Sequence, residues 1–225
     1  KSKGMDANKI FFDSGGLKIN AGPVSTFSNY SVISENRAIH KPKDISFKEA
    51  MLFGCAIPTG AGIVLNQVKP KPSNNILIIG LGGIGLSALI MAIALKVKKI
   101  AVIDISDSKL EYAKNLGADF AYNAKNKNLK EEVFAETKKG FDYCIESAGL
   151  IKTIELGFNL INKNYGQLFF ASHPPNNEKI SILPHELISG KKIFGSWGGE
   201  VRPDTDISKI WGLIKKADIN LNDFI

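Results

Sequence analysis

Three glycines and one aspartate give this 225-residue chain its clearest chemical signal. Gly80, Gly82 and Gly85 have the spacing G-x-G-x-x-G directly after an apolar run at residues 76–79. The first glycine permits a tight turn, the second lets the backbone approach a pyrophosphate, and the third lets a helix pack closely on a strand. Asp104 stands nineteen positions after Gly85, where an acid can accept hydrogen bonds from ribose hydroxyls. This spacing predicts a site for a dinucleotide.

Two elements must hold these residues in place. The wholly apolar run at 76–79 is typical of a strand buried on both faces, and the apolar segment at 84–95 has the length of a helix. The amino end of such a helix offers unpaired N–H groups and a positive dipole end to phosphates. Residues 76–95 are also twenty positions without a charge, about the length of a bilayer span. Because glycines divide this stretch into a strand-length and a helix-length piece, we predict a buried core segment and no membrane partner.

Asp104 also bears on which dinucleotide would bind. A carboxylate there repels a 2′-phosphate, and NADP enzymes usually place an arginine nearby instead. The next three residues are Ile105, Ser106 and Asp107, without an arginine. The sequence therefore favours NAD. The alternative for Asp104 is a solvated residue or a cap at the end of a strand.

Composition and charge narrow the classes of protein. A chain that is 44% hydrophobic and 23% charged is ordinary for a globular protein. The net charge of +7 comes from scattered lysines, so we predict no nucleic-acid partner and keep a basic nucleic-acid binder as an alternative. Cys55 and Cys144 form no disulfide framework and no secretory signal is visible, which predicts a cytoplasmic protein. Since the first residue is Lys, we expect a fragment or a processed product.

Strand and helix patterns alternate from residue 73 onward. This alternation implies parallel strands joined by right-handed crossovers. The predicted fold class is therefore α/β, a doubly wound six-stranded parallel sheet of the Rossmann type. Strands are predicted at residues 76–79, 100–103, 120–122, 143–145, 168–171 and 192–195, and helices at 84–97, 107–115, 129–138, 151–160 and 204–215.

The first forty residues have a different pattern. Residues 1–20 are polar and contain glycines without clear periodicity, which predicts a loop or an excised edge of a domain. Residues 26–33 are rich in aromatic and β-branched side chains and predict a strand, and a second short extended piece is predicted at 38–40. These pieces are too few for a sheet of their own, so they resemble the tail of a β-rich domain.

Two helices are predicted between this tail and the sheet. Ser46 and Glu49 have the spacing of a capping box, which marks a helix start. Residues 55–65 predict a second helix with Pro58 in its first turn, and the sequence KPKPS at 69–73 is a proline-rich joint.

Several of these segments together resemble one family. FGCAIPTGAG at 53–62, ILIIGLGGIG at 76–85, FDYCIESAG at 141–149 and GKKIFGSWGG at 190–199 resemble the zinc-dependent medium-chain alcohol dehydrogenases, from about residue 20 to the end. In that family a GroES-like catalytic domain precedes the nucleotide-binding domain. The resemblance implies three parts. They are residues 1–45 as a remnant of the catalytic domain, 46–72 as connecting helices, and 73–225 as the NAD-binding domain.

The resemblance also assigns roles to residues. It implies that Cys55 is a ligand of the catalytic zinc and that Thr59 lies beside the nicotinamide, and these two are the catalytic candidates. The implied cofactor residues are Gly82, Gly83 and Ile84 at the pyrophosphate, Asp104 and Lys109 at the ribose, and Ala148, Ala171, Ser172 and His173 at the nicotinamide.

This chain departs from the family's pattern at the metal. The family's other two protein ligands of the catalytic zinc come from upstream sequence and have no counterpart in residues 1–225. Because a catalytic zinc needs about three protein ligands, we expect residues 1–225 to be metal-free and inactive alone. Family members pair through an edge strand, here at residues 193–197, so the resemblance implies a homodimer.

The implied activity is hydride transfer between NAD and an alcohol or aldehyde. Two other readings stay open, a zinc-free medium-chain reductase of enones or quinones and a dinucleotide-binding module without turnover. Four residues are assigned structural or surface positions, namely Cys144 in a buried strand, Glu146 at a strand end, and His40 and His185.

Overall fold

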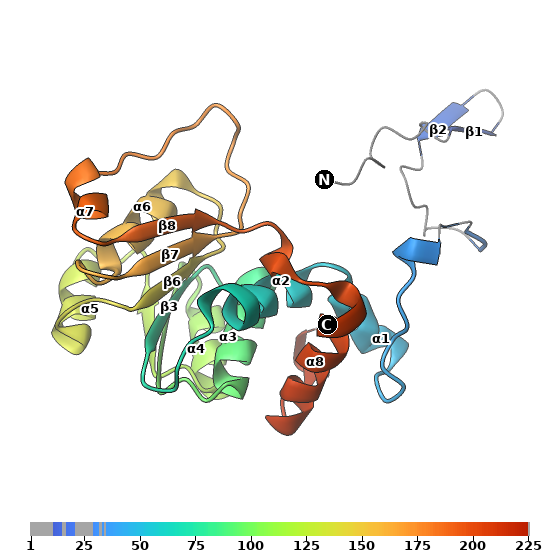
Figure 1. Cartoon of the computed structure of the whole chain (residues 1–225), viewed down its shortest axis with the longest axis horizontal. Helices are drawn as coiled ribbons and strands as arrows, with labels where there is room; N and C mark the ends of the chain where they lie inside the picture. Colours follow the sequence, from blue (N-terminus) through green and yellow to red (C-terminus); the bar gives the residue numbers. More distant parts are fainter. Residues whose placement is uncertain (1–10, 15–16, 21–28, 32, 34, 225) are drawn as a thin grey trace. The chain divides into compact units, whose positions relative to one another are not determined.

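The computed structural model describes residues 11–14, 17–20, 29–31, 33 and 35–224, and it divides into two compact units, Lys1–His40 and Lys41–Ile225 (Figure 1). In the first unit, β1 (Phe11–Ser14) pairs antiparallel with β2 (Leu17–Asn20), and a 3-10 turn follows at Glu35–Arg37. The second unit contains the sheet.

The first unit differs from the prediction. The loop predicted over residues 1–20 is wrong at 11–14 and 17–20, where two four-residue strands pair. The intervening Gly15-Gly16 is a sequence that favours a two-residue hairpin. Of the strand predicted at 26–33, residues 26–28 and 32 lie outside the described residues, and the described ones form no strand. Nor do residues 38–40, since β propensity produces a strand only where a face is buried against partners.

The second unit contains the predicted sheet, and all five of its pairings are parallel. The strand order is β5-β4-β3-β6-β7-β8, which places the two central strands where the chain reverses its direction of winding. The strands are β3 (Asn75–Ile79), β4 (Lys99–Asp104), β5 (Phe120–Asn123), β6 (Tyr143–Glu146), β7 (Gln167–Phe170) and β8 (Lys192–Gly195). The predicted fold class is confirmed.

Side-chain alternation along β3 explains why the sheet is covered on both faces. Ile76 and Ile78 pack in one apolar cluster with residues of α3 (Gly83–Ala94) and α8 (Pro203–Lys216). Leu77 and Ile79 pack in a second cluster with residues of α5 (Leu129–Thr137) and α6 (Ile151–Leu160). Each of these four side chains is almost fully buried. A strand buried on both faces has no polar alternation, which is why it reads as a continuous apolar run.

The helices match the predicted ones closely, and the Ser46–Glu49 capping box is present. Outside the prediction is α7, a five-residue helix with proline at its start. The helices are α1 (Phe47–Ala50), α2 (Ala56–Gly62), α3 (Gly83–Ala94), α4 (Asp107–Leu116), α5 (Leu129–Thr137), α6 (Ile151–Leu160), α7 (Pro184–Ile188) and α8 (Pro203–Lys216), with a 3-10 turn at Met51–Gly54 and a π-helical turn at Ile63–Val68 after α1 and α2.

The apolar stretch 76–95 divides into β3 and α3, as predicted. Within the described part of the chain, no single helix has the length and apolar character needed to cross a membrane. The segments Phe47–Gly54 and Ala56–Val68 reach that length and apolar character only when taken together, and they are bent by 59° relative to each other.

Helix α2 packs tightly against the start of α3. A Cβ atom on Gly60 would collide with the backbone carbonyl oxygen of Ile84, and one on Gly62 would lie 2.6 Å from the carbonyl oxygen of Gly199. The two glycines therefore let α2 approach both α3 and the turn after β8. This contact brings the Cys55–Thr59 segment toward the carboxyl end of the sheet.

Candidate functional site

A cleft of about 330 Å³ opens beyond the carboxyl ends of β3, β4 and β6. It brings together five of the predicted cofactor residues. These are Gly80, Gly82, Asp104, Lys109 and Ala148. The other lining residues are Ile79, Leu81, Ile103, Ile105, Ala124, Ser147, Leu150 and Thr153. Ligands of open α/β sheets bind at this kind of crevice, outside the carboxyl ends of strands where the winding reverses.

The three glycines of the turn have different physical roles. Gly80 has φ +89°, and a Cβ atom there would lie 2.8 Å from the amide nitrogen of Ala148. Gly85 is buried, and its Cβ atom would collide with the carbonyl oxygen of Gly80. A Cβ atom on Gly82 would meet no atom within 4 Å. Gly80 and Gly85 therefore serve the packing of strand, turn and helix, whereas Gly82 borders open space.

The start of α3 borders that space. Gly83 begins the helix and is exposed, and Gly82 at the cap position has no side chain to bond the first amides. Ile84, the next residue, is half-buried. The first N–H groups of a helix lack partners inside it and carry a positive dipole end, so they suit a phosphate group.

Asp104 lies at the end of β4 with its carboxylate fixed by two backbone amides. Leu81 donates to Oδ2 at 2.7 Å, and Ser106 donates to Oδ1 at 3.0 Å. A carboxylate has about four acceptor sites, so each oxygen keeps capacity for a further donor such as a ribose hydroxyl. Lys109 is exposed in the first turn of α4 and lines the same cleft.

Two apolar residues in the cleft wall are absent from the predicted site. Ile105 is 63% exposed and Leu150 is 60% exposed, although both are large hydrophobic side chains. Exposed apolar surface of this kind can take the face of a planar base. The only sequence signal is an apolar residue directly after a polar strand end or a glycine, which is too common to single them out.

Glu146, assigned a structural position above, is the last residue of β6 and directly precedes the cleft residues Ser147 and Ala148. Its side chain is 0% exposed. Oε1 accepts hydrogen bonds from the amides of Ala148 and Gly149, both at 2.9 Å, and from Thr153 Oγ1 at 2.7 Å. Oε2 accepts from Ser172 Oγ at 2.6 Å. Ala148 and Ser172, two of the predicted nicotinamide residues, are therefore tied to one carboxylate.

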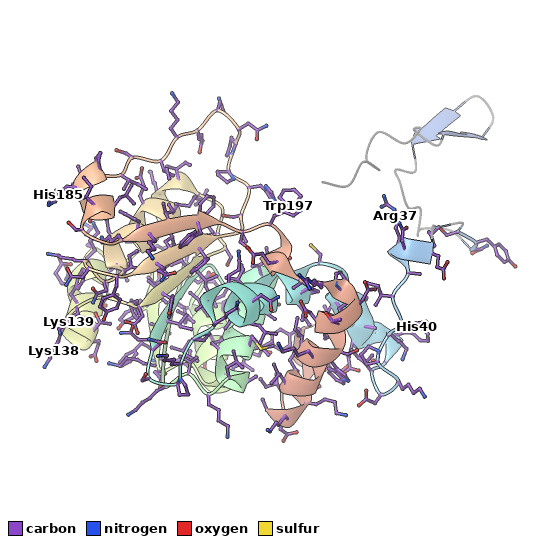
Figure 2. All side chains as sticks on the ribbon, viewed as in Figure 1. Arg37, His40, Lys138, Lys139, His185 and Trp197 are labelled. Carbon is purple, nitrogen blue, oxygen red and sulfur yellow. The ribbon has the colours of Figure 1, made fainter. Side chains whose placement is uncertain are left out.

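The other predicted residues after β7 lie close by. Ala171 is buried, and its amide donates to the carbonyl oxygen of Glu146 at 3.2 Å. His173 is exposed and packs edge-to-face on Trp197, with ring centroids 5.2 Å apart. Figure 2 shows Trp197 just beyond β8, whereas His185 lies at the opposite end of that strand by α7.

The two candidates on α2 do not line the cleft. Cys55 is exposed at the cap position of α2, and Thr59 is 8% exposed one turn further along. Among the described residues, no group of three or more His, Cys, Asp or Glu side chains could hold a metal ion. One thiolate does not make a zinc site, so the described residues do not by themselves fit zinc.

Cys144, the second cysteine, is a core residue. It is fully buried in β6, and burial together with the nearby Glu146 charge raises the pKa of its thiol well above the ordinary value. A thiol held neutral in this way is a poor nucleophile and a poor metal ligand.

Comparison with known proteins places the chain in a family. A family model described as zinc-binding dehydrogenase matches residues 83–216. Alcohol dehydrogenase class-2 isozyme 2 of Oryctolagus cuniculus is 30% identical over 90% of this chain and 54% of its own length. S-(hydroxymethyl)glutathione dehydrogenase of Synechocystis is 28% identical over 89% of this chain and 55% of its own length.

Solved structures agree. Benzyl alcohol dehydrogenase from Acinetobacter calcoaceticus superposes with a TM-score of 0.83 at 27% identity, over 89% of this chain and 55% of that protein. The chain thus spans about half the length of the relatives it matches. Since the family model covers more than half of its residues, the chain belongs to the zinc-binding dehydrogenase family.

Proposed function

We propose that this chain binds NAD and forms the cofactor-binding half of a zinc-dependent alcohol dehydrogenase. The reaction would be hydride transfer between an alcohol or aldehyde and NAD. The observation that carries the proposal is the open space above Gly82, in a cleft that also contains the fixed carboxylate of Asp104. A bound nicotinamide cofactor supplies the hydride chemistry, and the protein positions and orients it.

The described residues would divide the cofactor among them. Gly82, Gly83 and Ile84 at the start of α3 would hold the pyrophosphate through backbone amides. Asp104 and Lys109 would bind the adenosine ribose, and a base would lie against the apolar wall of the cleft. Across the crevice, Ala148 and residues 171–173 would border the nicotinamide, with Thr59 beside it on α2.

We assign Cys55 as one zinc ligand of a longer enzyme. The further ligands of that zinc would come from outside residues 1–225. Its exposed position at the cap of α2 leaves the thiol accessible to such a shared site. Because one thiolate holds no catalytic zinc, we expect residues 1–225 to bind cofactor without turning over an alcohol. The family assignment favours this function over a zinc-free reductase or a module without turnover. Two free cysteines and the absence of a disulfide pair support a cytoplasmic location.

We also propose that two copies pair along β8. This strand is an edge of the sheet, and Phe194 on it is 40% exposed. The neighbouring α7 segment adds exposed apolar side chains at Leu183 and Ile188. Apolar edges of this kind are normally covered in a native protein.

Titration of the chain with NADH and NADPH tests the cofactor assignment. We expect tighter binding of NADH, because the Asp104 carboxylate donates nothing to a 2′-phosphate and repels it. Asp104→Asn keeps one acceptor oxygen but loses the charge, and it should reduce the preference about tenfold, the scale of one hydrogen bond to a charged group. Asp107→Asn is the matched control, since it removes an equal charge three residues away.

Two results would contradict the assignment. Equal affinity of the unmodified chain for NADH and NADPH would show that Asp104 does not select the cofactor. An equal loss of preference in Asp107→Asn would mean that net charge, rather than a contact at Asp104, discriminates between the two nucleotides.

A further inference from the structure

Glu146 is a fully buried carboxylate, and no ion pair is found for it in the described residues. A buried charge is stable only when hydrogen bonds replace its lost water. Four donors do so here, two backbone amides and two hydroxyl groups, all within 2.6–2.9 Å. The amides belong to the chain entering α6, whose amino end also favours negative charge. The carboxylate is therefore fully satisfied without a cation.

The two oxygens bind different segments of the chain. Oε1 holds residues 148–149 and Thr153, which follow β6 directly. Oε2 holds Ser172, which follows β7 and is 26 positions away from Glu146 in sequence. One rigid carboxylate thus spans the gap between the loops that follow two adjacent parallel strands. Its planar geometry fixes the distance between these loops.

The loop on the Oε1 side is in turn fixed to the glycine turn. Ser147 Oγ donates to the carbonyl oxygens of Ile79 at 3.1 Å and Gly80 at 2.8 Å. Ala148 packs so closely that a Cβ atom on Gly80 would lie 2.8 Å from its amide nitrogen. Residues 147–149 therefore connect the glycine turn to Glu146, and Glu146 connects them to Ser172.

We propose that Glu146 is a positioning residue that seats the nicotinamide end of the cofactor by holding Ser172 at a set distance from Ala148. The inference rests on the proposed NAD-binding function. Glu146 itself, at 0% exposure, touches no ligand, so its effect acts through the two loops. The adenosine end, which lies by Asp104, should not depend on it.

ADP-ribose and NADH separate these two ends, because ADP-ribose lacks the nicotinamide. The ratio of their affinities for one protein measures how well the nicotinamide is seated. Ser172→Ala removes the donor to Oε2. It should lower the affinity for NADH relative to ADP-ribose by at least about fivefold, while the affinity for ADP-ribose stays within about twofold of that of the unmodified chain. Ser189→Ala is the matched control, since it removes a serine hydroxyl at the end of α7 that donates to the carbonyl oxygen of His185 at 2.8 Å and does not line the cleft, and it should leave the ratio within about twofold.

Variants of Glu146 provide a second measurement. Glu146→Gln keeps an oxygen for the two amides, and its side-chain N–H can donate to Ser172 Oγ in reverse, so the NADH preference should survive. Glu146→Ala removes both bonds and should lose the preference. If Glu146→Ala fails to fold, the contrast between Ser172→Ala and Ser189→Ala decides alone.

The outcomes are distinct from those of the parent proposal. If the unmodified chain binds neither ADP-ribose nor NADH, the proposed function fails and this inference fails with it. If the unmodified chain prefers NADH but Ser172→Ala keeps the same ratio, only the positioning role of Glu146 is wrong. A parallel loss of both affinities in Ser172→Ala would also overturn it, because that pattern indicates general damage to the fold.

Discussion

At the scale of single residues, Gly82 and Gly85 show how one residue type serves two needs in one motif. Gly82 has φ −82° and ψ −171°, a backbone conformation open to any residue, and its missing side chain leaves empty space. Gly85 is buried where the helix meets the carbonyl oxygen of Gly80. Gly85 is therefore needed for the fold, whereas the packing of the fold does not require a glycine at position 82, where we propose that the ligand does.

This difference makes a paired prediction. Gly82→Ala should change the free energy of unfolding by less than about 1 kcal/mol, since a weaker helix cap and a less flexible unfolded chain nearly cancel. It should weaken ADP-ribose binding at least tenfold, by about 1.4 kcal/mol or more, because the methyl group occupies the approach of the pyrophosphate. Gly85→Ala should instead lose about 1–3 kcal/mol of stability through overpacking.

Urea unfolding followed by circular dichroism and calorimetric titration with ADP-ribose measure the two quantities. Normal ADP-ribose affinity in Gly82→Ala would show that the pyrophosphate lies elsewhere. Full stability of Gly85→Ala would show that the helix can shift to admit a Cβ atom, against the close approach seen here.

Some site residues follow from the sequence and others depend on pairing. Gly80, Gly82 and Asp104 lie near one another because a strand, a turn and a helix of fixed length connect them, so local spacing suffices. The bond between Glu146 and Ser172 depends instead on β6 and β7 being neighbours in register, which joins residues 26 positions apart. No local pattern encodes that contact, and it is absent from the sequence prediction for this reason.

At the scale of elements, helix α8 is tied to the chain before α1 by one carboxylate. Asp44 accepts a hydrogen bond from Trp211 Nε1 at 2.9 Å and forms an ion pair with Lys215. The bond from Lys215, followed by that from Trp211, lowers the pKa of Asp44 from 3.8 to about 2. The tether lies at the surface, with both charged side chains about half exposed.

The lowered pKa predicts where the tether is lost. Its stabilising contribution is complete above the unfolded value of 3.8 and disappears as the pH falls through about 2. Lys215→Met removes the largest cause of the shift. The difference in unfolding free energy between the unmodified chain and Lys215→Met should therefore be constant above pH 4 and shrink as the pH falls from about 4 to 2.

Urea unfolding at a series of pH values measures this difference, with Lys216→Met as the control for an equal loss of charge in the same helix turn. The control should show no such change between pH 4 and 2. A difference for Lys215→Met that stays constant down to pH 2 would mean that the ion pair does not set the pKa of Asp44.

The predicted elements were reliable where burial on both faces fixes a pattern. β3 and α3 were found within two or three residues because a continuous apolar strand and a charge-free helix have few other solutions. The hairpin β1–β2 and the short helix α7 were missed. Each has only four or five residues per element, too few for a period to emerge, and α7 buries no side chain in the core.

At the scale of the whole molecule, the two edges of the sheet differ. β5 ends one side, and all four of its residues are half-buried. β8 ends the other, and Lys192 and Ser196 donate their amides inward to Gly166 and Phe170 of the β7 side, at 2.9 and 2.8 Å. Backbone groups alternate along a strand, so those of residues 193 and 195 point outward. Figure 1 shows β8 along the outer margin of the sheet.

Pairing of two copies along this edge makes the last prediction. Phe194→Lys places a charge on the outer strand, and edge lysines are a common device against strand pairing. We expect the unmodified chain to have the mass of a dimer in size-exclusion chromatography with light scattering, and Phe194→Lys to have that of a monomer. Phe47→Lys is the control, because Phe47 on α1 is 84% exposed and remote from β8 in the fold. Either of two results would contradict pairing along β8. The unmodified chain could have the mass of a monomer, or the dimer could survive in Phe194→Lys.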